Sequence, residues 1–313
     1  MGLTVGVDVG GTKIAAGVVD EQGKIIDQTR VETPEDDEAG SVAAIIAVVR
    51  ELHASHEVAA VGLGCAGFVD AGRSTVLFAP NLSWTDVELR HTVGSATGLP
   101  VVVENDANAA AWAEFQFGAG ADVQDMVCVT VGTGIGGGLV LDGRLYRGAG
   151  GFAAELGHIR VVPDGLRCGC GLKGCWEQYA SGRALVREAR DLAKTRSPLA
   201  ERLLEMAGGS PKAITGHMVT QAAAEGDEAA IELLETLGQW LGAGMATVAA
   251  TLDPAVFVVG GGVSEAGDLL IEPARASFRR HLTGRSHRPE PEIRLAQLGN
   301  EAGIVGAADL ARI

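Results

Sequence analysis

Two stretches of this chain repeat one local design: a strand, a glycine turn, a second strand, a polar turn and a third strand. The first covers residues 5–26 with its glycine turn at 10–11, and the second covers residues 127–146 with its glycine turn at 132–134. β-Branched runs joined by short Gly- and Asp-containing turns predict antiparallel meanders. The duplication predicts an α/β protein with two similar lobes, each offering a glycine turn to a shared cleft.

The rest of the chain is predicted to be mainly helical. The first helix is expected to begin at Ser41, which would serve as its N-cap. It is followed by a buried strand and by further helices, which begin at polar residues and end near Gly or Pro. The last helix is expected to return to the first lobe and brace it. The predicted helices are 41–53, 88–97, 107–117, 183–194, 199–207, 217–224, 227–252 and 302–311, and the predicted single strands are 58–63, 101–103 and 256–259.

The composition limits the partners of this chain. Its 313 residues suffice for two modest domains, and its formal net charge is −15. Such a charge argues against nucleic acid as a standing partner, because phosphate contacts need clustered Lys and Arg. The chain shows no leader-like start and no apolar run long enough for a bilayer. We therefore expect a cytoplasmic protein with neither a nucleic-acid nor a membrane partner.

Three of the five cysteines fall within eight residues and share a metal-ligand spacing. They are Cys168, Cys170 and Cys175, and His158 precedes them. Three thiolates and one imidazole complete a tetrahedral zinc shell, and such clustered thiols fit a reducing compartment better than a disulfide framework. Because the protein itself would fill all four positions of this 158–175 loop, we predict a structural Zn²⁺ without a role as a Lewis acid.

The first glycine turn has the composition of a phosphate-binding turn. Glycines let backbone N–H groups approach phosphate oxygens, a threonine hydroxyl can join them, and the preceding acid, Asp8, can hold Mg²⁺ through water. For this turn alone an ordinary hairpin would be the better interpretation; its repetition at Gly132 favours phosphate binding because paired glycine hairpins resemble the phosphate clamp of actin- and hexokinase-type ATPases. No Walker motif is present, and the two Gly-x-Gly-x-x-Gly matches that start at Gly62 and Gly132 continue as strands, so we exclude a dinucleotide site.

Asn105 and Asp106 lie where a predicted buried strand meets a helix. A carboxylate at such a position can accept the proton of a substrate hydroxyl during phosphoryl transfer, and a neighbouring amide can bond a second hydroxyl. Both residue types are also common helix N-caps. From these residues alone, catalysis and capping are equally good interpretations.

Together these motifs resemble the ROK family of sugar kinases and sugar-responsive repressors. The resemblance extends from the turn at Asp8 to the glycines at Gly260, and includes a complete Cys-x-Cys-Gly-x2-Gly-Cys-x-Glu motif. It implies a two-lobed actin-like/ribonuclease H-like ATPase fold with an interlobe cleft. The small N-terminal lobe would comprise 1–118 plus 300–313, and the large C-terminal lobe 119–299.

The resemblance also implies roles for individual residues. Asp106 would be the catalytic base. The sugar would be bound by Asn81, Asn105, Asp106, Glu155, His158 and Glu177. Mg-ATP would be bound by Asp8, Gly10, Gly11, Thr12, Lys13, Gly132, Thr133, Gly134, Gly261 and Gly262.

The implied activity is that of a glucokinase, which forms glucose 6-phosphate from glucose and ATP. Alternatives are another hexose or N-acetylhexosamine as acceptor, polyphosphate as donor, and a non-catalytic sugar sensor or repressor. Only two residues precede the first strand and the net charge is negative, so we expect a kinase and no repressor. A homodimer or homotetramer is expected by resemblance.

Overall fold

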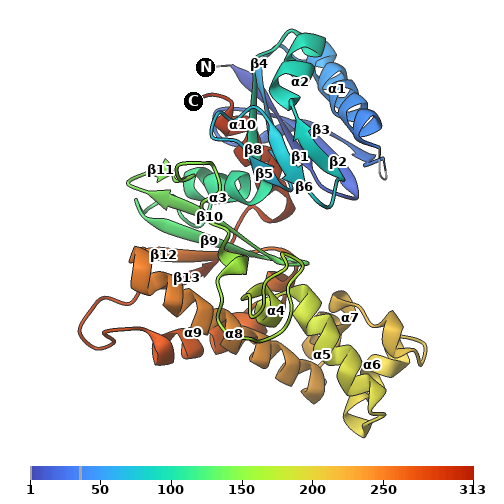
Figure 1. Ribbon diagram of the computed structural model, residues 1–313, viewed down its shortest axis with the longest axis vertical. Coiled ribbons are helices and arrows are strands. Elements are labelled where there is room, and N and C mark those ends of the chain that lie inside the picture. Colours follow the sequence, from blue (N-terminus) through green and yellow to red (C-terminus); the bar gives the residue numbers. More distant parts are fainter. Residues whose placement is uncertain (1, 35–36) are drawn as a thin grey trace. The chain divides into compact units, whose positions relative to one another are not determined.

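The chain is described by a computed structural model for residues 2–34 and 37–313 (Figure 1). It is a mixed α/β protein that divides into two compact units, each described by itself below. The first unit comprises Met1–Cys128, Gly137–Ala154 and Ala296–Ile313, and the second comprises Val129–Gly136 and Glu155–Leu295. The lobe limits expected from the sequence stay a prediction.

The first unit is built on a five-stranded sheet, and the predicted meander supplies three of its strands. The strand order is β3-β2-β1-β4-β8. Strands β1 to β3 are antiparallel, whereas β4 and β8 run parallel to β1. Parallel strands end at the same sheet edge, and the register pairs Val9 with Cys65 and Cys65 with Asn105. The bounds are β1 Leu3–Val9, β2 Lys13–Val19, β3 Ile25–Glu32, β4 Val58–Cys65 and β8 Val101–Asn105.

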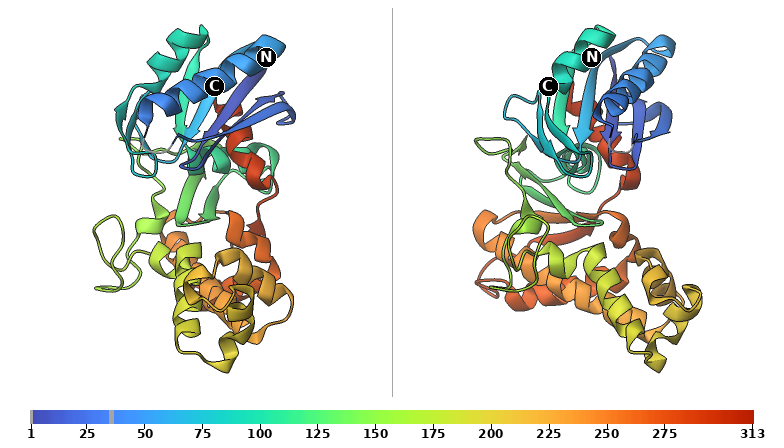
Figure 2. Two further views of the ribbon diagram at one scale, coloured as in Figure 1. Left: turned by 90° about the vertical axis from the view of Figure 1, so that its right-hand side faces the viewer. Right: turned by 45° about the vertical axis from the view of Figure 1, so that its right-hand side comes forward.

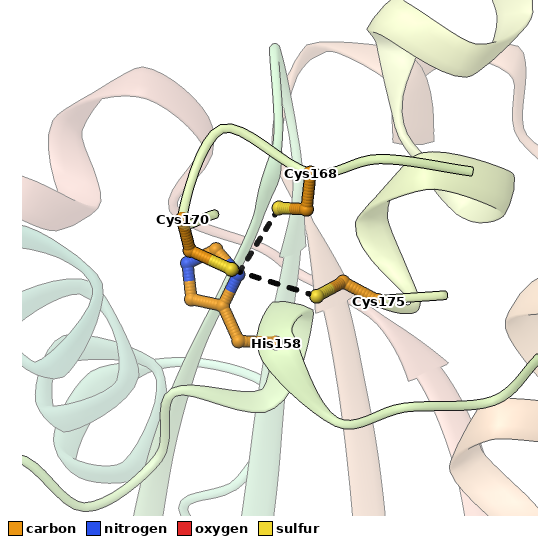
Figure 3. Close-up of side chains that lie close together, drawn as sticks. All are labelled: His158, Cys168, Cys170 and Cys175. Atoms are coloured by element: carbon orange, nitrogen blue, oxygen red, sulfur yellow. Dashed lines mark hydrogen bonds between the residues drawn. The ribbon is translucent and has the colours of Figure 1, made fainter. Parts of the chain in front are cut away.

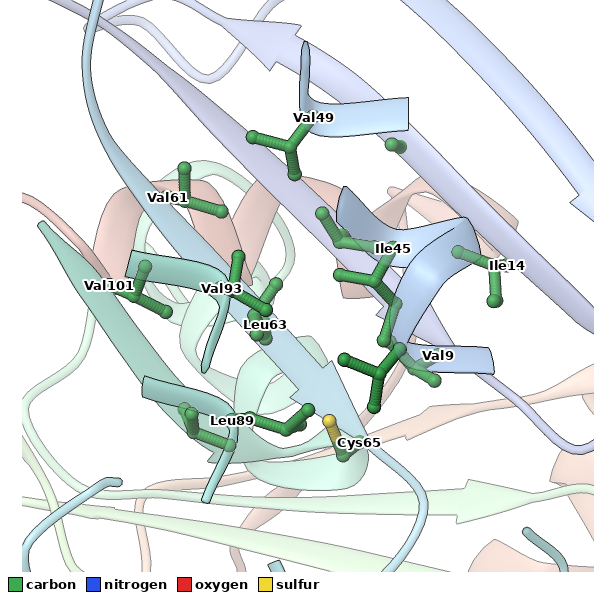
Figure 4. Close-up of a cluster of buried hydrophobic side chains, with 14 of the residues drawn as sticks. Val9, Ile14, Ile45, Val49, Val61, Leu63, Cys65, Leu89, Val93 and Val101 are labelled. Carbon is green, nitrogen blue, oxygen red and sulfur yellow. The ribbon is translucent and has the colours of Figure 1, made fainter. Parts of the chain in front are cut away.

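Helices cover both faces of this sheet (Figures 1 and 2). Helices α1 (Glu38–Ser55) and α2 (Leu89–Thr97) pack on one face, and α3 (Asp106–Phe117) and α10 (Ala302–Leu310) pack on the other. Figure 4 shows the core on the α1 and α2 side, where aliphatic side chains of helices and strands interdigitate. Burial of each such side chain stabilises the unit by about 1.5–3 kcal/mol. The prediction that the last helix returns to the first lobe is confirmed.

Helix α10 lies unusually close to the sheet because two strand residues opposite it lack a side chain. A Cβ on Gly6 would overlap the carbonyl oxygen of Ile304, and a Cβ on Gly62 would overlap that of Ala307. Both oxygens belong to the backbone of α10, so neither can move without moving the helix. The glycines at these strand positions therefore set the distance between helix and sheet.

This close approach predicts a large difference between two substitutions in β4. Gly62→Ala should lower the free energy of unfolding by about 3 kcal/mol, since overpacking at a backbone contact forces a helix shift. Gly64→Ala is the matched control, because its Cβ would meet its nearest atom, the Ala109 Cβ, at an ordinary 3.5 Å. Urea unfolding of both variants measures the difference. Equal stability of the two would contradict this account of the packing.

A small three-stranded sheet, β5-β6-β7, belongs to the same unit. Its strands are β5 Phe68–Val69, β6 Val76–Ala79 and β7 Trp84–Val87. The β6–β7 connection is the turn predicted around Asn81, closed by a hydrogen bond from Leu82 N to Ala79 O of 3.0 Å. The sequence had indicated this turn but none of the three strands.

The second five-stranded sheet has the order β11-β10-β9-β12-β13. Strands β10 and β11 are antiparallel, and β12 and β13 are parallel. The second predicted meander is therefore present as three consecutive strands that lie next to one another. The bounds are β9 Met126–Val131, β10 Ile135–Leu141, β11 Arg144–Leu145, β12 Val256–Gly260 and β13 Glu292–Leu295.

Helices make up most of the second unit. The longest, α8, begins after the N-cap Asp227 and ends before Asp253, which adopts a left-handed conformation; it packs along α9. No helix in the described part of the chain is long and apolar enough to cross a membrane. The helices are α4 Glu177–Ala180, α5 Gly182–Lys194, α6 Glu201–Met206, α7 Gly216–Ala224, α8 Glu228–Leu252 and α9 Asp268–His281, with 3-10 turns at Leu156–His158, Pro198–Ala200, Pro211–Ala213, Gly262–Ala266 and, in the first unit, Gly299–Glu301.

Candidate functional site

Asp106 is the first residue of α3, and its carboxylate is oriented by two donors. The backbone N–H of Ala107 and the Nδ2 of Asn105 donate to its Oδ1 at 2.9 and 3.1 Å. The side chain is half-buried at the edge where β8 ends. Two donors on one oxygen favour the charged form and fix the direction of the carboxylate, as a general base requires.

Asn105 caps α3, so the structural interpretation of this residue is confirmed. Its Oδ1 accepts from Asn108 N at 3.0 Å, and its Nδ2 donates to Gly67 O at 3.1 Å as well as to Asp106. Both amide hydrogens are therefore used within the protein, and the Oδ1 keeps one lone pair. Capping and sugar binding are compatible only if Asn105 accepts a hydrogen bond from a hydroxyl.

The predicted phosphate turn lies in the same unit. The turn closes with Gly10 N donating to Lys13 O at 3.0 Å, and a Cβ on Gly11 would lie 2.7 Å from the Asn81 carbonyl oxygen. The turn thus approaches Asn81 so closely that only glycine fits. The Thr12 side chain is exposed.

Asp8 is the penultimate residue of β1 and lies beside this turn; burial raises the pKa of its carboxyl although Lys13 lowers it. Burial raises the pKa of the Cys65 thiol well above its ordinary value, and the charges of Asp106, Asp8 and Glu104 raise it further. The structure therefore brings Asp8 and Asp106 to the two sides of Cys65. A divalent cation at Asp8 would reverse the effect of burial on its carboxyl.

In the second unit the glycine turn after β9 is held by the N-terminus of α5. Gly182 N donates to Gly132 O at 2.8 Å and Arg183 N donates to Thr133 O at 3.2 Å. Gly261 has a φ of +87° and lies against the backbone of Val131. The two glycine motifs predicted for nucleotide binding are therefore neighbours.

These motifs border a cavity of about 820 Å³, large enough for a nucleoside. Three of the residues predicted to bind nucleotide line it, namely Gly132, Thr133 and Gly262. The other residues that line the cavity could not be predicted from the sequence. Helical periodicity indicates which face of α5 is apolar or polar, but it does not show what that face contacts. Those residues are Gly182, Arg183, Val186, Arg187, Arg190, Asp191, Lys194, Gly216, His217, Thr220, Val263 and Glu265.

The four predicted metal ligands come together in the second unit (Figure 3). Their ligand atoms all lie within 4.8 Å of one another; the Cys168 Sγ is 3.6 Å from the His158 Nδ1, and the Cys170 and Cys175 sulfurs are 3.6 Å apart. A tetrahedral shell with Zn–S bonds of about 2.3 Å would separate its ligand atoms by about 3.8 Å. The donor set and its spacing fit a metal ion without rearrangement.

The acidic sugar-binding candidates surround this metal cluster. Glu177 Oε1 lies 3.1 Å from the Cys168 sulfur, and Glu155 Oε2 lies 3.9 Å from the His158 Nε2. Burial raises the pKa of Glu155, His158 lowers it, and the Glu177 charge raises it again. A Cβ on Gly134 would lie 2.6 Å from the Glu177 carboxylate, so this glycine borders the acid. Glu155, His158 and Glu177 therefore share one surface.

Comparison with known proteins identifies the family. The sequence pattern of the ROK family matches residues 4–313. This chain belongs to the ROK family. The glucokinase of Streptomyces coelicolor is 53% identical over 312 residues, which cover 100% of this chain and 98% of that protein. The two-lobed α/β fold class expected from the sequence is confirmed by solved ROK structures.

Two solved ROK structures match nearly the whole chain. A ROK glucokinase from Streptomyces griseus in complex with glucose and AMPPNP is 55% identical, with a TM-score of 0.91 and 99% of each chain covered. A ROK hexokinase from Thermus thermophilus is 37% identical, with a TM-score of 0.82, covering 99% of this chain and 98% of that one. The catalytic, sugar-binding, nucleotide-binding and metal-binding roles predicted for individual residues stay predictions.

Proposed function

We propose that this ROK chain is a glucokinase that transfers the γ-phosphoryl group of ATP to the 6-hydroxyl of glucose. The observation that carries the proposal is the Asp106 carboxylate, half-buried and oriented by two donors at the start of α3. Relatives named glucokinase support the choice of sugar and donor, since they are 53–55% identical over almost the whole chain, and one of them holds glucose and an ATP analogue.

In the proposed reaction Asp106 takes the proton of the sugar hydroxyl. The oxygen's electron pair forms the new O–P bond while the bond between the γ-phosphorus and the β,γ-bridging oxygen breaks, and ADP leaves with that electron pair. Asn81, Asn105, Glu155, His158 and Glu177 would orient the sugar through its other hydroxyls. Planar amides and carboxylates can form paired hydrogen bonds with vicinal hydroxyls. A sugar that lacks one of these hydroxyls would leave a buried polar group without a hydrogen-bond partner.

The nucleotide is assigned to the motifs of the two glycine turns. The cavity beside Gly132, Thr133 and Gly262 would hold the adenosine, with Gly261 and Gly134 shaping the adjoining backbone. The turn of Gly10, Gly11, Thr12 and Lys13 would contact phosphate oxygens through backbone N–H groups and the Thr12 hydroxyl. Asp8 would hold Mg²⁺ through water, and that ion would supply charge neutralisation of the transferring phosphoryl group.

We assign Zn²⁺ to His158, Cys168, Cys170 and Cys175. Four protein ligands fill a tetrahedral shell and leave no open position, so the ion is structural. It would fix the ring of His158 and the position of Glu177, both proposed to contact the sugar. Clustered thiols support a reducing compartment, so we propose a cytoplasmic protein, and by analogy with its family a homodimer or homotetramer.

Coupled turnover with Mg-ATP across several sugars tests this function. We expect selective phosphorylation of glucose over fructose, mannose, N-acetylglucosamine and N-acetylmannosamine, with polyphosphate a poor donor in parallel reactions. Preference for another sugar would reassign the substrate within the kinase class, an outcome that the Thermus thermophilus hexokinase makes worth testing. Absence of turnover with every pair, from folded and zinc-replete protein, would refute the kinase and favour a sugar sensor.

A further inference from the structure

Glu104, the residue before the Asn105-Asp106 pair, is a buried carboxylate to which the proposed reaction assigns no role. It is 1% exposed and lies near the end of β8. Its Oε1 accepts hydrogen bonds from Asn105 N at 3.0 Å, Asn108 Nδ2 at 3.1 Å and Arg147 Nε at 3.0 Å. Its Oε2 forms an ion pair with Arg73 Nε at 3.2 Å.

The two arginines bring distant segments of the first unit to this carboxylate. Arg147, which follows β11, also donates to Asp70 O at 2.9 Å and Ala71 O at 3.1 Å. The backbone of Arg73, between β5 and β6, accepts a hydrogen bond from Val103 N of β8 at 3.0 Å. Glu104 therefore joins the 70–75 loop and the segment after β11 to the last residues of β8.

Stability alone is a poor reason for such a cluster. Removing a carboxylate and two guanidinium groups from water costs several kcal/mol per ion, and well-packed apolar residues would often be more stable. Burial lowers the pKa of Arg73, and the neighbouring Glu104 charge counters that effect. A buried ion cluster is better explained by the position that it imposes on its neighbours.

The residues that Glu104 holds are connected by hydrogen bonds to Asp106, the proposed base. Glu104 holds the backbone of Asn105 and the side chain of Asn108, and these two residues also bond to each other as the N-cap of α3. Asn105 in turn donates to Asp106 Oδ1. A shift of Asn105 would release one of the two donors that orient the carboxylate.

We propose that Glu104 is a positioning residue for phosphoryl transfer, acting with Arg147 and Arg73 through Asn105 on the Asp106 carboxylate. The inference rests on the proposed kinase function. It assigns to Glu104 no contact with sugar or nucleotide. It predicts that the rate of the chemical step and the basicity of Asp106 both depend on a residue two positions away in a buried ion cluster.

The test compares Glu104→Gln with Glu114→Gln. Glu114 is the matched control because it is also 1% exposed and accepts from backbone N–H groups of Ala119, Gln297 and Leu298 toward the other end of α3. In Glu104→Gln an NH₂ donor would face arginine and asparagine donors, so the cap should shift. We expect kcat to fall on the order of 100-fold with little change in the KM for ATP, since a misplacement of about 1 Å at a reacting centre is that costly.

The pH profile separates positioning from general destabilisation. Losing the Asn105 donor removes a bond to the charged form of Asp106, which raises its pKa, so the acidic limb of kcat should move to higher pH. Other charged or titratable groups around Asp106 are Asp8 on β1 and Cys65 on β4. Arg73 and Arg147 act on Asp106 through Glu104, to which both are paired. Glu114→Gln should lose unfolding stability to a similar extent without moving that limb.

Distinct outcomes overturn distinct claims. Wild-type kcat and an unmoved acidic limb in Glu104→Gln would refute the positioning role, and so would an equal loss of kcat in both variants. If Glu104→Gln does not fold, Arg147→Lys decides: it keeps the charge but cannot bond Glu104, Asp70 and Ala71 together, so kcat should fall with the same shift of the limb. Failure of the wild-type protein to phosphorylate any sugar would refute the proposed function instead.

Discussion

Asp106→Asn is expected to fold and bind glucose while losing about 10³-fold in kcat, near the middle of the range that general bases contribute. The amide is nearly isosteric, and its oxygen can still accept the hydrogen bond that Ala107 N donates in the native protein. It cannot take a proton from the sugar hydroxyl. The barrier to phosphoryl transfer should therefore rise while the ground-state complex persists.

Steady-state kinetics, calorimetric titration with glucose and thermal unfolding together check this result. Asp125→Asn is the matched control, since it removes the same charge from a half-buried carboxylate of the same unit that accepts a hydrogen bond from Asp142 N at 3.0 Å. We expect the control to retain wild-type kcat. Turnover of Asp106→Asn within a few-fold of wild type would remove Asp106 from the role of base.

Local patterns predicted the elements that carry the proposed site. Both glycine turns lie between consecutive strands as expected, and α3 begins at the strand end that contains Asn105. The boundaries were less accurate. The first helix was expected to begin at Ser41, but α1 begins three residues earlier at Glu38, because the Asp37 carboxylate accepts from Gly40 N at 2.8 Å and serves as its N-cap. Two good N-cap residues four positions apart, Asp37 and Ser41, leave the start of this helix ambiguous in the sequence.

Elements that depend on distant partners were missed. Helix α9 contains Pro273, which breaks the local helical pattern, and it is stabilised by α8, where Gly238 leaves room for that proline. Strand β13 has four residues and exists as the parallel partner of β12, with Val256 opposite Glu292. Nothing within either segment indicates such pairing.

The same limit applies to the site. The metal ligands could be predicted because their spacing within 18 residues is itself the signal. The ion cluster of Glu104 could not be, since Arg147 lies 43 residues away and reaches the carboxylate only through the fold. Residues that touch a ligand often occur in motifs, whereas residues that hold them in place are defined by tertiary contacts.

Loss of one metal ligand should lower both the zinc content and the glucose affinity of this protein. Cys170→Ser is the most informative change, because the Cys170 side chain is exposed and its removal creates no cavity. A serine hydroxyl is a poor zinc ligand, so we expect the zinc content to fall from about one ion per chain to a small fraction. The affinity for glucose should fall by about 10- to 100-fold, a loss of the size that metal affinity or activity suffers when groups that orient a metal site are removed.

The expected loss of affinity follows from what the metal would hold in place. Glu177 lies beside Cys168, and Glu155 lies beside His158, so release of the ion frees both acids together with the imidazole. Cys128→Ser is the matched control, as a buried thiol outside the cluster. Elemental analysis and glucose titration of both variants measure the effect. Unchanged glucose affinity in zinc-free Cys170→Ser would show that the loop orders its sugar-binding residues without the metal.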